Sequence, residues 1–149
     1  TSAKNPDLRP LRKLIVVPEA HLFTATQEGA AFLDQTARLG RALGASLAID
    51  SQDPTSIAER DGIMEQIVSV FAFSQKTRKQ QDAVAEILGL TPSDQVRTML
   101  SSINTAPKVG FWHGHCLMRD AYDRVATVQV AIPNATVARA LDTTPRRTA

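Results

Sequence analysis

Acidic and amide side chains follow two short apolar segments of this sequence, in positions that could support hydrolytic chemistry. A β-branched run over 13–17 is followed by Pro18 and Glu19, and a second run, over 46–51, is followed by Gln52. Short continuous apolar runs are typical of central strands in a parallel sheet. Because ligands bind at the carboxyl edge of such sheets, we expect Glu19 and Gln52 to face one crevice. There the carboxylate could orient or deprotonate a water molecule, and the amide could hydrogen-bond a phosphate oxygen.

An arginine near the end of the intervening helix could complete such a site. Arg41 follows Arg38 in the string Arg38-Leu39-Gly40-Arg41 and could stabilise charge on a phosphate held by a neighbouring subunit. The helix dipole also favours arginine at helix C-termini, which would explain both residues without catalysis. Likewise, Glu19 alone could be a solvated residue at a strand end, and Gln52 could simply enter a helix. We expect His21, two residues after Glu19, to make a local hydrogen bond.

The alternation of strand and helix signals predicts an α/β fold. A first helix should open with the capping-box pair Thr24 and Gln27, stop at Gly44, and carry Phe32 and Leu39 at helical spacing. The order β-α-β-α-β-α-α-β-β favours a mostly parallel sheet covered on both sides, with an antiparallel hairpin at one edge. The remaining expected elements are a helix over 55–65 after Asp53-Pro54, a strand over 67–73, a helix over 76–88, a short helix after the cap at 91–94, and hairpin strands over 109–117 and 125–132.

Composition argues against several classes of function. The chain has 149 residues, one cysteine and a net charge of +2. It lacks an apolar run of membrane-spanning length and a long basic run for tracking phosphates, and the short basic segment 76–81 is better explained as a solvated helix face than as a DNA contact. His113, His115 and Cys116 are too few for a zinc site, so no metal site is predicted there. No G-x-S-x-G motif supports a serine hydrolase, and the single cysteine agrees with a cytoplasmic location.

Residues 13–132 resemble the ATPases of conjugative DNA transfer and type IV secretion, and more broadly the hexameric DNA-pump ATPases. The resemblance rests on the order and spacing of several short strings. These are the apolar strand with Glu19-Ala20, the helix end Gly40-Arg41-x-x-Gly44, the strand closing with Ser51-Gln52, Ile87-Leu88-Gly89-Leu90, and Gly114-His115-Cys116-Leu117-Met118-Arg119-Asp120 followed by Arg124-Val125.

This resemblance implies a three-layer, RecA-like P-loop NTPase core that binds ATP with Mg²⁺ and forms a hexameric ring. By position, Glu19 would be the catalytic carboxylate, Gln52 the phosphate sensor, and Arg41 an arginine finger acting on the adjacent subunit. The implied partners are the conjugation or secretion machinery and, as a further possibility, DNA. The implied location is the cytoplasm, at the inner face of the membrane through partners.

Two departures from the family pattern narrow this interpretation. The sequence contains no G-x-x-x-x-G-K-[ST] phosphate loop, and Pro18 stands where a metal-supporting acid is usual. Asp50 is a conceivable substitute for that acid. We therefore interpret residues 1–149 as a single partial domain, the carboxy-terminal half of a motor without its Walker A portion, with 133–149 as a tail.

We expect the chain alone not to bind ATP tightly, and so to be inactive as an ATPase without the rest of the protein. Two alternatives stay open. One is a non-catalytic assembly module that keeps the ATPase scaffold, which Pro18 favours. The other is a stand-alone α/β domain of unrelated function.

Overall fold

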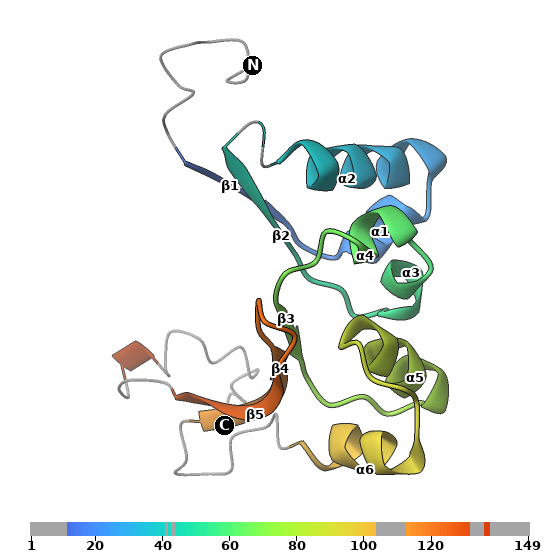
Figure 1. Cartoon of the computed structure of the whole chain (residues 1–149), viewed down its shortest axis with the longest axis vertical. Helices are drawn as coiled ribbons and strands as arrows, with labels where there is room; N and C mark the ends of the chain where they lie inside the picture. The colour runs from blue at the N-terminus through green and yellow to red at the C-terminus, as the bar shows by residue number, and fades with distance from the viewer. Residues whose placement is uncertain (1–11, 41, 43, 104–112, 132–135, 138–149) are drawn as a thin grey trace, which may run out of the picture.

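The computed structural model describes residues 12–40, 42, 44–103, 113–131 and 136–137. Its strands form a layer with the helices along one side (Figure 1). Strands and helices alternate along most of the chain, as expected. In order they are β1 (Lys13–Val17), α1 (Ala20–Thr24), α2 (Gln27–Leu39), β2 (Ala45–Ile49), α3 (Thr55–Ala58), α4 (Asp61–Met64), β3 (Val70–Ala72), α5 (Arg78–Ile87), α6 (Asp94–Ser102), β4 (His113–Arg119) and β5 (Val125–Ala131).

The strands form two separate sheets within the described part of the chain. β1 and β2 are parallel, in a register that pairs Lys13 with Ala45 and Val17 with Ile49. β3, β4 and β5 are antiparallel in that order, and β4 and β5 form the expected hairpin. The prediction of one mostly parallel sheet is therefore confirmed only for β1 and β2, since no backbone pairing joins β2 to β3 among the described residues.

The helices cover one face of the strand layer (Figure 1). Along β1, Ile15 and Val17 pack toward the helices, whereas Leu14 and Val16 are 66% and 62% exposed on the opposite face. The expectation of helices on both faces is therefore wrong for the residues that the structure describes. The connection from β1 to β2 is a crossover between parallel strands, and it carries α1 and α2, whose buried residues Ala20 and Leu33 belong to the core on this face.

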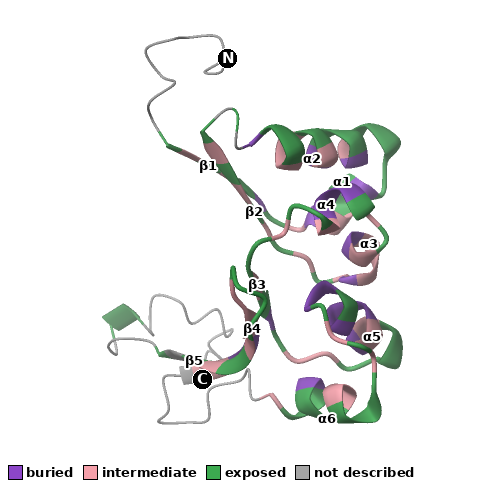
Figure 2. Cartoon of the chain, in the orientation of Figure 1, coloured by how far each residue is buried: buried purple, intermediate pink, exposed green. Residues whose placement is uncertain are grey.

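Two clusters of buried apolar side chains lie between the helices and the sheets, and Figure 2 shows the buried positions on the helices and strands that contribute to them. Val70 on β3 packs against two clusters of buried side chains, one under each sheet. Each fully buried leucine or isoleucine contributes about 1.5–3 kcal/mol relative to an exposed one. The clusters comprise Val17, Ala20, Leu33, Ile57, Ile63 and Ile87, and Ala72, Val84, Leu88, Leu100 and Leu117.

The predicted capping of the first long helix is wrong. Thr24 ends the short helix α1, is buried, and donates its hydroxyl to the carbonyl of His21. The N-cap of α2 is Thr26, whose side chain accepts from the N–H of Gly29. The helix ends at Leu39, with Gly40 as its C-cap, and so stops before the expected Gly44.

The apolar positions expected on that helix and the length of the next helix also differ from the prediction. Phe32 and Leu39 are 50% and 44% exposed, while Ala30 and Leu33 are buried. The helix predicted over 55–65 is divided into α3 and α4, because Arg60 takes an extended conformation between them. The strand predicted over 67–73 is shorter and covers Val70–Ala72.

The later helices follow their sequence signals closely. Thr77 caps α5 by accepting from Gln80 N, and Gly89 follows its C-terminal end with φ +72°. Ser93 caps α6 in the same way by accepting from Val96 N. The helix expected over 76–88 corresponds to α5, and Ser93 lies within the cap expected at 91–94, because each signal depends on residues within one turn of the helix terminus. The cap Thr77 was not predicted.

Candidate functional site

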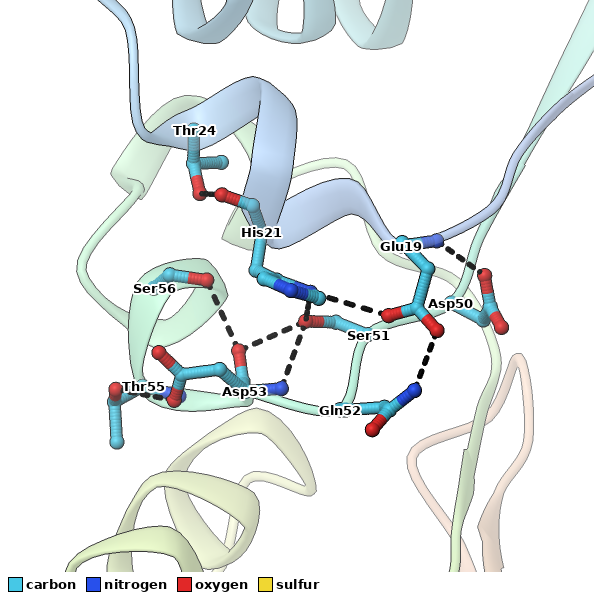
Figure 3. A network of polar contacts seen from close by, with 9 residues as sticks. All are labelled: Glu19, His21, Thr24, Asp50, Ser51, Gln52, Asp53, Thr55 and Ser56. Atoms are coloured by element: carbon cyan, nitrogen blue, oxygen red, sulfur yellow. Dashed lines mark hydrogen bonds and ion pairs between the residues drawn. The ribbon is translucent and has the colours of Figure 1, made fainter.

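Glu19 lies between the end of β1 and the start of α1, in a tightly constrained backbone position. Its φ and ψ of 51° and 48° are left-handed, which is uncommon for a residue other than glycine. Its N–H donates to Asp50 Oδ1 at 2.9 Å, and the N–H of Ala20 donates to the Asp50 carbonyl at 2.8 Å. Asp50 directly follows β2, so the two strand ends are tied together at this edge (Figure 3).

Each oxygen of the Glu19 carboxylate faces a different side chain. Gln52 donates its amide Nε2 to Oε1 at 2.5 Å, and His21 Nδ1 lies 3.3 Å from Oε2 (Figure 3). The Glu19 side chain as a whole is 36% exposed, yet Oε2 is buried and the described residues offer it no hydrogen bond of good geometry. The expected proximity of Glu19 and Gln52 is thus confirmed, whereas their roles stay predictions.

Ser51 adds a hydroxyl to this cluster but does not complete a hydrolytic triad. Its Oγ lies 3.5 Å from His21 Nδ1, the same ring nitrogen that faces Glu19. A triad histidine uses its two ring nitrogens separately, one for the nucleophile and one for the acid. Ser51 also donates its hydroxyl proton to the Asp53 carbonyl at 2.9 Å. This arrangement supports a structural hydroxyl and not an activated nucleophile.

Two of the arginines considered for this site, Arg38 and Arg60, belong to the described residues. Arg41, the predicted finger, lies outside them. Arg38 is an exposed residue in the last turn of α2, and its Nη2 lies against Gly62, where a Cβ atom would stand 3.1 Å away. Arg60 donates to the Thr24 carbonyl at 2.9 Å and so fixes the C-terminal end of α1.

A comparison with family models decides the classification of the chain. A model described as the AAA-like domain matches residues 7–141. The chain belongs to the AAA-like domain family. A search of curated proteins finds no match to the chain. Membership in this family indicates an ATPase-type function. It does not specify conjugation or type IV secretion, the processes implied by the resemblance of the short sequence strings.

Two carboxylates of this AAA-like domain, those of Glu19 and Asp50, belong to residues that are hydrogen-bonded to each other at the ends of β1 and β2. Mg²⁺ prefers carboxylate oxygens and water, and the carboxylates of Glu19 and Asp50 both lie at the joined strand ends. Pro18, which is exposed, offers no ligand. The cradle of backbone N–H groups and the lysine that meet nucleotide phosphates are not in this sequence. The sequence thus supplies two carboxylates of a type that Mg²⁺ accepts, Glu19 and Asp50, but no phosphate-binding loop.

His115 and Cys116 of this AAA-like domain lie on β4, in the sheet that does not contain β1, the strand before Glu19. Cys116 is fully buried, and this burial raises the pKa of its thiol. His115 lines a pocket of about 330 Å³ between α6 and the β4–β5 hairpin, together with Met99, Ser102, Ile103, Leu117 and Thr127. Among the described residues, no group of three or more His, Cys, Asp or Glu side chains is arranged to hold a metal ion.

No helix within the described part of the chain is long and apolar enough to cross a membrane.

The sequence did not predict every contact that His21 makes near Glu19. The spacing Glu19-Ala20-His21 indicated a local hydrogen bond, but the contact with Ser51, 30 residues later, has no sequence signal.

Proposed function

We propose that this AAA-like domain supplies the catalytic carboxylate and the nucleotide sensor of an ATP-hydrolysing motor that drives DNA or protein translocation in conjugation or type IV secretion. The observation that carries the proposal is the direct contact of Gln52 Nε2 with Glu19 Oε1 at the joined ends of β1 and β2. A base and an amide held together at the carboxyl edge of parallel strands suit the control of a water molecule beside a phosphate.

In this mechanism Glu19 orients the attacking water and accepts its proton. Gln52 is exposed, so its amide can leave Glu19 and hydrogen-bond a phosphate oxygen, which links the position of the carboxylate to the nucleotide state. Mg²⁺, when bound, would neutralise charge on the phosphates. Asp50 is the carboxylate available to support the metal in place of Pro18, and Arg41 would act on the nucleotide of the adjacent subunit in a hexameric ring.

The proposed fold of the whole motor is a RecA-like core in which a further strand, followed by the phosphate loop, joins the two sheets. Two observations support this. Within the described residues, β2 pairs only with β1 and β3 only with β4, so each has a free edge. Val70 on β3 nevertheless packs against the cluster beneath β1 and β2, so the two sheets already share one core. ATP and Mg²⁺ would bind only when the phosphate loop is present.

The test uses the full-length protein that contains this chain, provided that its coding sequence includes a G-x-x-x-x-G-K-[ST] loop. Substituting Glu19→Gln should lower the kcat for ATP at least ~100-fold, because a general base is lost, while the Kd for nucleotide stays unchanged. The matched control is Glu65→Gln, an exposed glutamate that caps the C-terminal end of α4, which should keep wild-type turnover. Undiminished turnover in the Glu19→Gln protein would remove Glu19 from the catalytic role.

A second candidate function is a non-catalytic assembly module with the same scaffold. Pro18 favours it, because proline replaces a carboxylate at the position that usually supports the metal. Under this alternative the full-length protein would lack the phosphate loop, would not turn over ATP, and would act through subunit contacts. Magnesium-dependent ATP hydrolysis by the wild-type protein would exclude it.

A further inference from the structure

We propose that His21 is a positioning residue for the Glu19 carboxylate, holding Oε2 with the proton on its ring Nδ1. The inference rests on the proposed function in one respect, namely that Glu19 performs the chemistry. It concerns the contact between His21 Nδ1 and Glu19 Oε2, to which neither the family match nor the resemblance of the sequence strings gives a role. Its starting point is the buried Oε2 atom, which lacks a well-formed hydrogen bond but lies 3.3 Å from His21 Nδ1.

The surroundings of His21 determine which ring nitrogen carries the proton. Ser51 Oγ lies 3.5 Å from Nδ1, and its hydroxyl proton is donated to the Asp53 carbonyl, so Oγ faces the ring as an acceptor. The carboxylate oxygen of Glu19 is also an acceptor. Ser51 Oγ and Glu19 Oε2, the two groups nearest Nδ1, can both accept a hydrogen bond, and this arrangement favours the tautomer of neutral His21 that carries its proton on Nδ1.

Helix α1 gives His21 a firmer position than Gln52 has. Ala20 is fully buried and its N–H donates to Asp50, while Arg60 holds the carbonyl of the buried Thr24 at the other end of the helix. Gln52 is exposed in the segment between β2 and α3. His21 thus keeps the Glu19 carboxylate oriented when the Gln52 amide moves away to a phosphate oxygen. The contact with His21 is therefore permanent, whereas the contact with Gln52 changes with the nucleotide state.

The first test reads the proton position directly and needs no nucleotide. In the chain of residues 1–149, nitrogen NMR of the imidazoles can resolve three histidines, and His21→Asn identifies the signal of His21. Neutral His21 should be protonated at Nδ1, and Glu19→Ala should shift the population toward the Nε2–H form. A His21 ring protonated mainly at Nε2 in the wild-type chain would overturn the proposal.

The second test uses ATP turnover by the full-length protein. Asparagine places its amide nitrogen close to the position of Nδ1, whereas glutamine reaches the position of Nε2 and alanine has no donor. His21→Asn should retain kcat within about threefold, while His21→Gln and His21→Ala lower it roughly 10-fold with KM for ATP unchanged, as is typical when a supporting hydrogen bond is lost. Equal kcat in all three variants, or an asparagine variant as slow as alanine, contradicts positioning through Nδ1.

The two tests separate this inference from the proposed function. If Glu19→Gln leaves ATP turnover intact, the proposed function fails, and the proton position still decides whether His21 holds the carboxylate. If Glu19→Gln abolishes turnover but the His21 substitutions leave kcat unchanged, Glu19 keeps its role and His21 loses the one proposed here.

Discussion

At the scale of single residues, Glu19 combines a carboxylate with a left-handed backbone that costs a residue other than glycine or asparagine about 1–2 kcal/mol. The contacts to Asp50, Gln52 and His21 hold this conformation in place. Strain of this kind is common where a side chain must be aimed at a ligand. It also makes the stability of the chain sensitive to the residue type at position 19.

Comparing two substitutions at this position isolates the backbone strain. Glu19→Asn and Glu19→Ala both lose the carboxylate, but asparagine tolerates the left-handed region and alanine does not. We therefore expect the asparagine variant to be more stable than the alanine variant by roughly 1 kcal/mol, measured as the free energy of unfolding in urea. Equal stability would mean that Glu19 does not keep a positive φ in solution.

At the scale of elements, the turn between β4 and β5 is organised by one carboxylate. Asp120 Oδ1 accepts from the N–H groups of Tyr122 and Arg124, and Oδ2 accepts from Arg124 Nε at 2.7 Å. The side-chain contact with Arg124, followed by these backbone hydrogen bonds, lowers the pKa of Asp120 below its usual 3.8. This turn closes the hairpin to which β3 is paired.

The lowered pKa of Asp120 makes the stability of the hairpin dependent on pH. A carboxylate with a lowered folded pKa stabilises the fold above the unfolded pKa of 3.8, and this contribution is lost as pH falls through the folded pKa. Asp120→Asn should therefore lower the urea midpoint at pH 7, and its difference from wild type should shrink below pH 3.8.

A neighbouring aspartate provides the control for this pH dependence. Asp123 also has a positive φ, of 59°, and its side chain is 87% exposed. Asparagine tolerates that backbone conformation, and the contact of the Asp123 carboxylate with Arg119 Nε is long, at 3.9 Å, and exposed on the Asp123 side. Asp123→Asn should therefore change the urea midpoint little at any pH. A difference between Asp120→Asn and wild type that stays constant from pH 7 to pH 3 would show that the carboxylate charge does not organise the turn.

At the scale of the whole molecule, the strand layer presents an apolar face opposite its helices. Large side chains on this layer and its loops are about half to two thirds exposed, namely Leu14, Val16, Val68, Phe71 and Phe73. Clustered exposed apolar side chains mark surfaces that associate with other protein, and free strand edges strengthen that tendency. The chain of residues 1–149 should therefore self-associate as its concentration rises.

Charged substitutions on this face test that expectation. Val16→Lys and Phe71→Lys should each increase the monomeric fraction in sedimentation velocity, with little change in melting temperature because both side chains are largely exposed. Leu22→Lys is the matched control, since Leu22 is 64% exposed but lies on α1. A wild-type chain that stays monomeric at high concentration, or an equal effect of Leu22→Lys, would contradict association through the strand face.

Much of the fold could be predicted because its signals are local. The apolar runs of β1 and β2, the cap Ser93 and the end of α5 before Gly89 each depend on a few adjacent residues. The same locality places Glu19 and Gln52 after consecutive strands, so their proximity followed from the parallel pairing of those strands. The role of Arg41 stays a prediction, since that residue lies outside the described part of the chain.

The sequence alone thus determined which side chains stand at the ends of β1 and β2, while only the tertiary structure decided how they are held. Thr24 failed as the predicted cap because it is buried in a short helix that sequence periodicity does not reveal. His21 meets Ser51 only through contacts 30 residues apart, and the division into two sheets depends on strand pairing at long range. Such contacts depend on which surfaces meet after the chain collapses, and local propensity does not encode that choice.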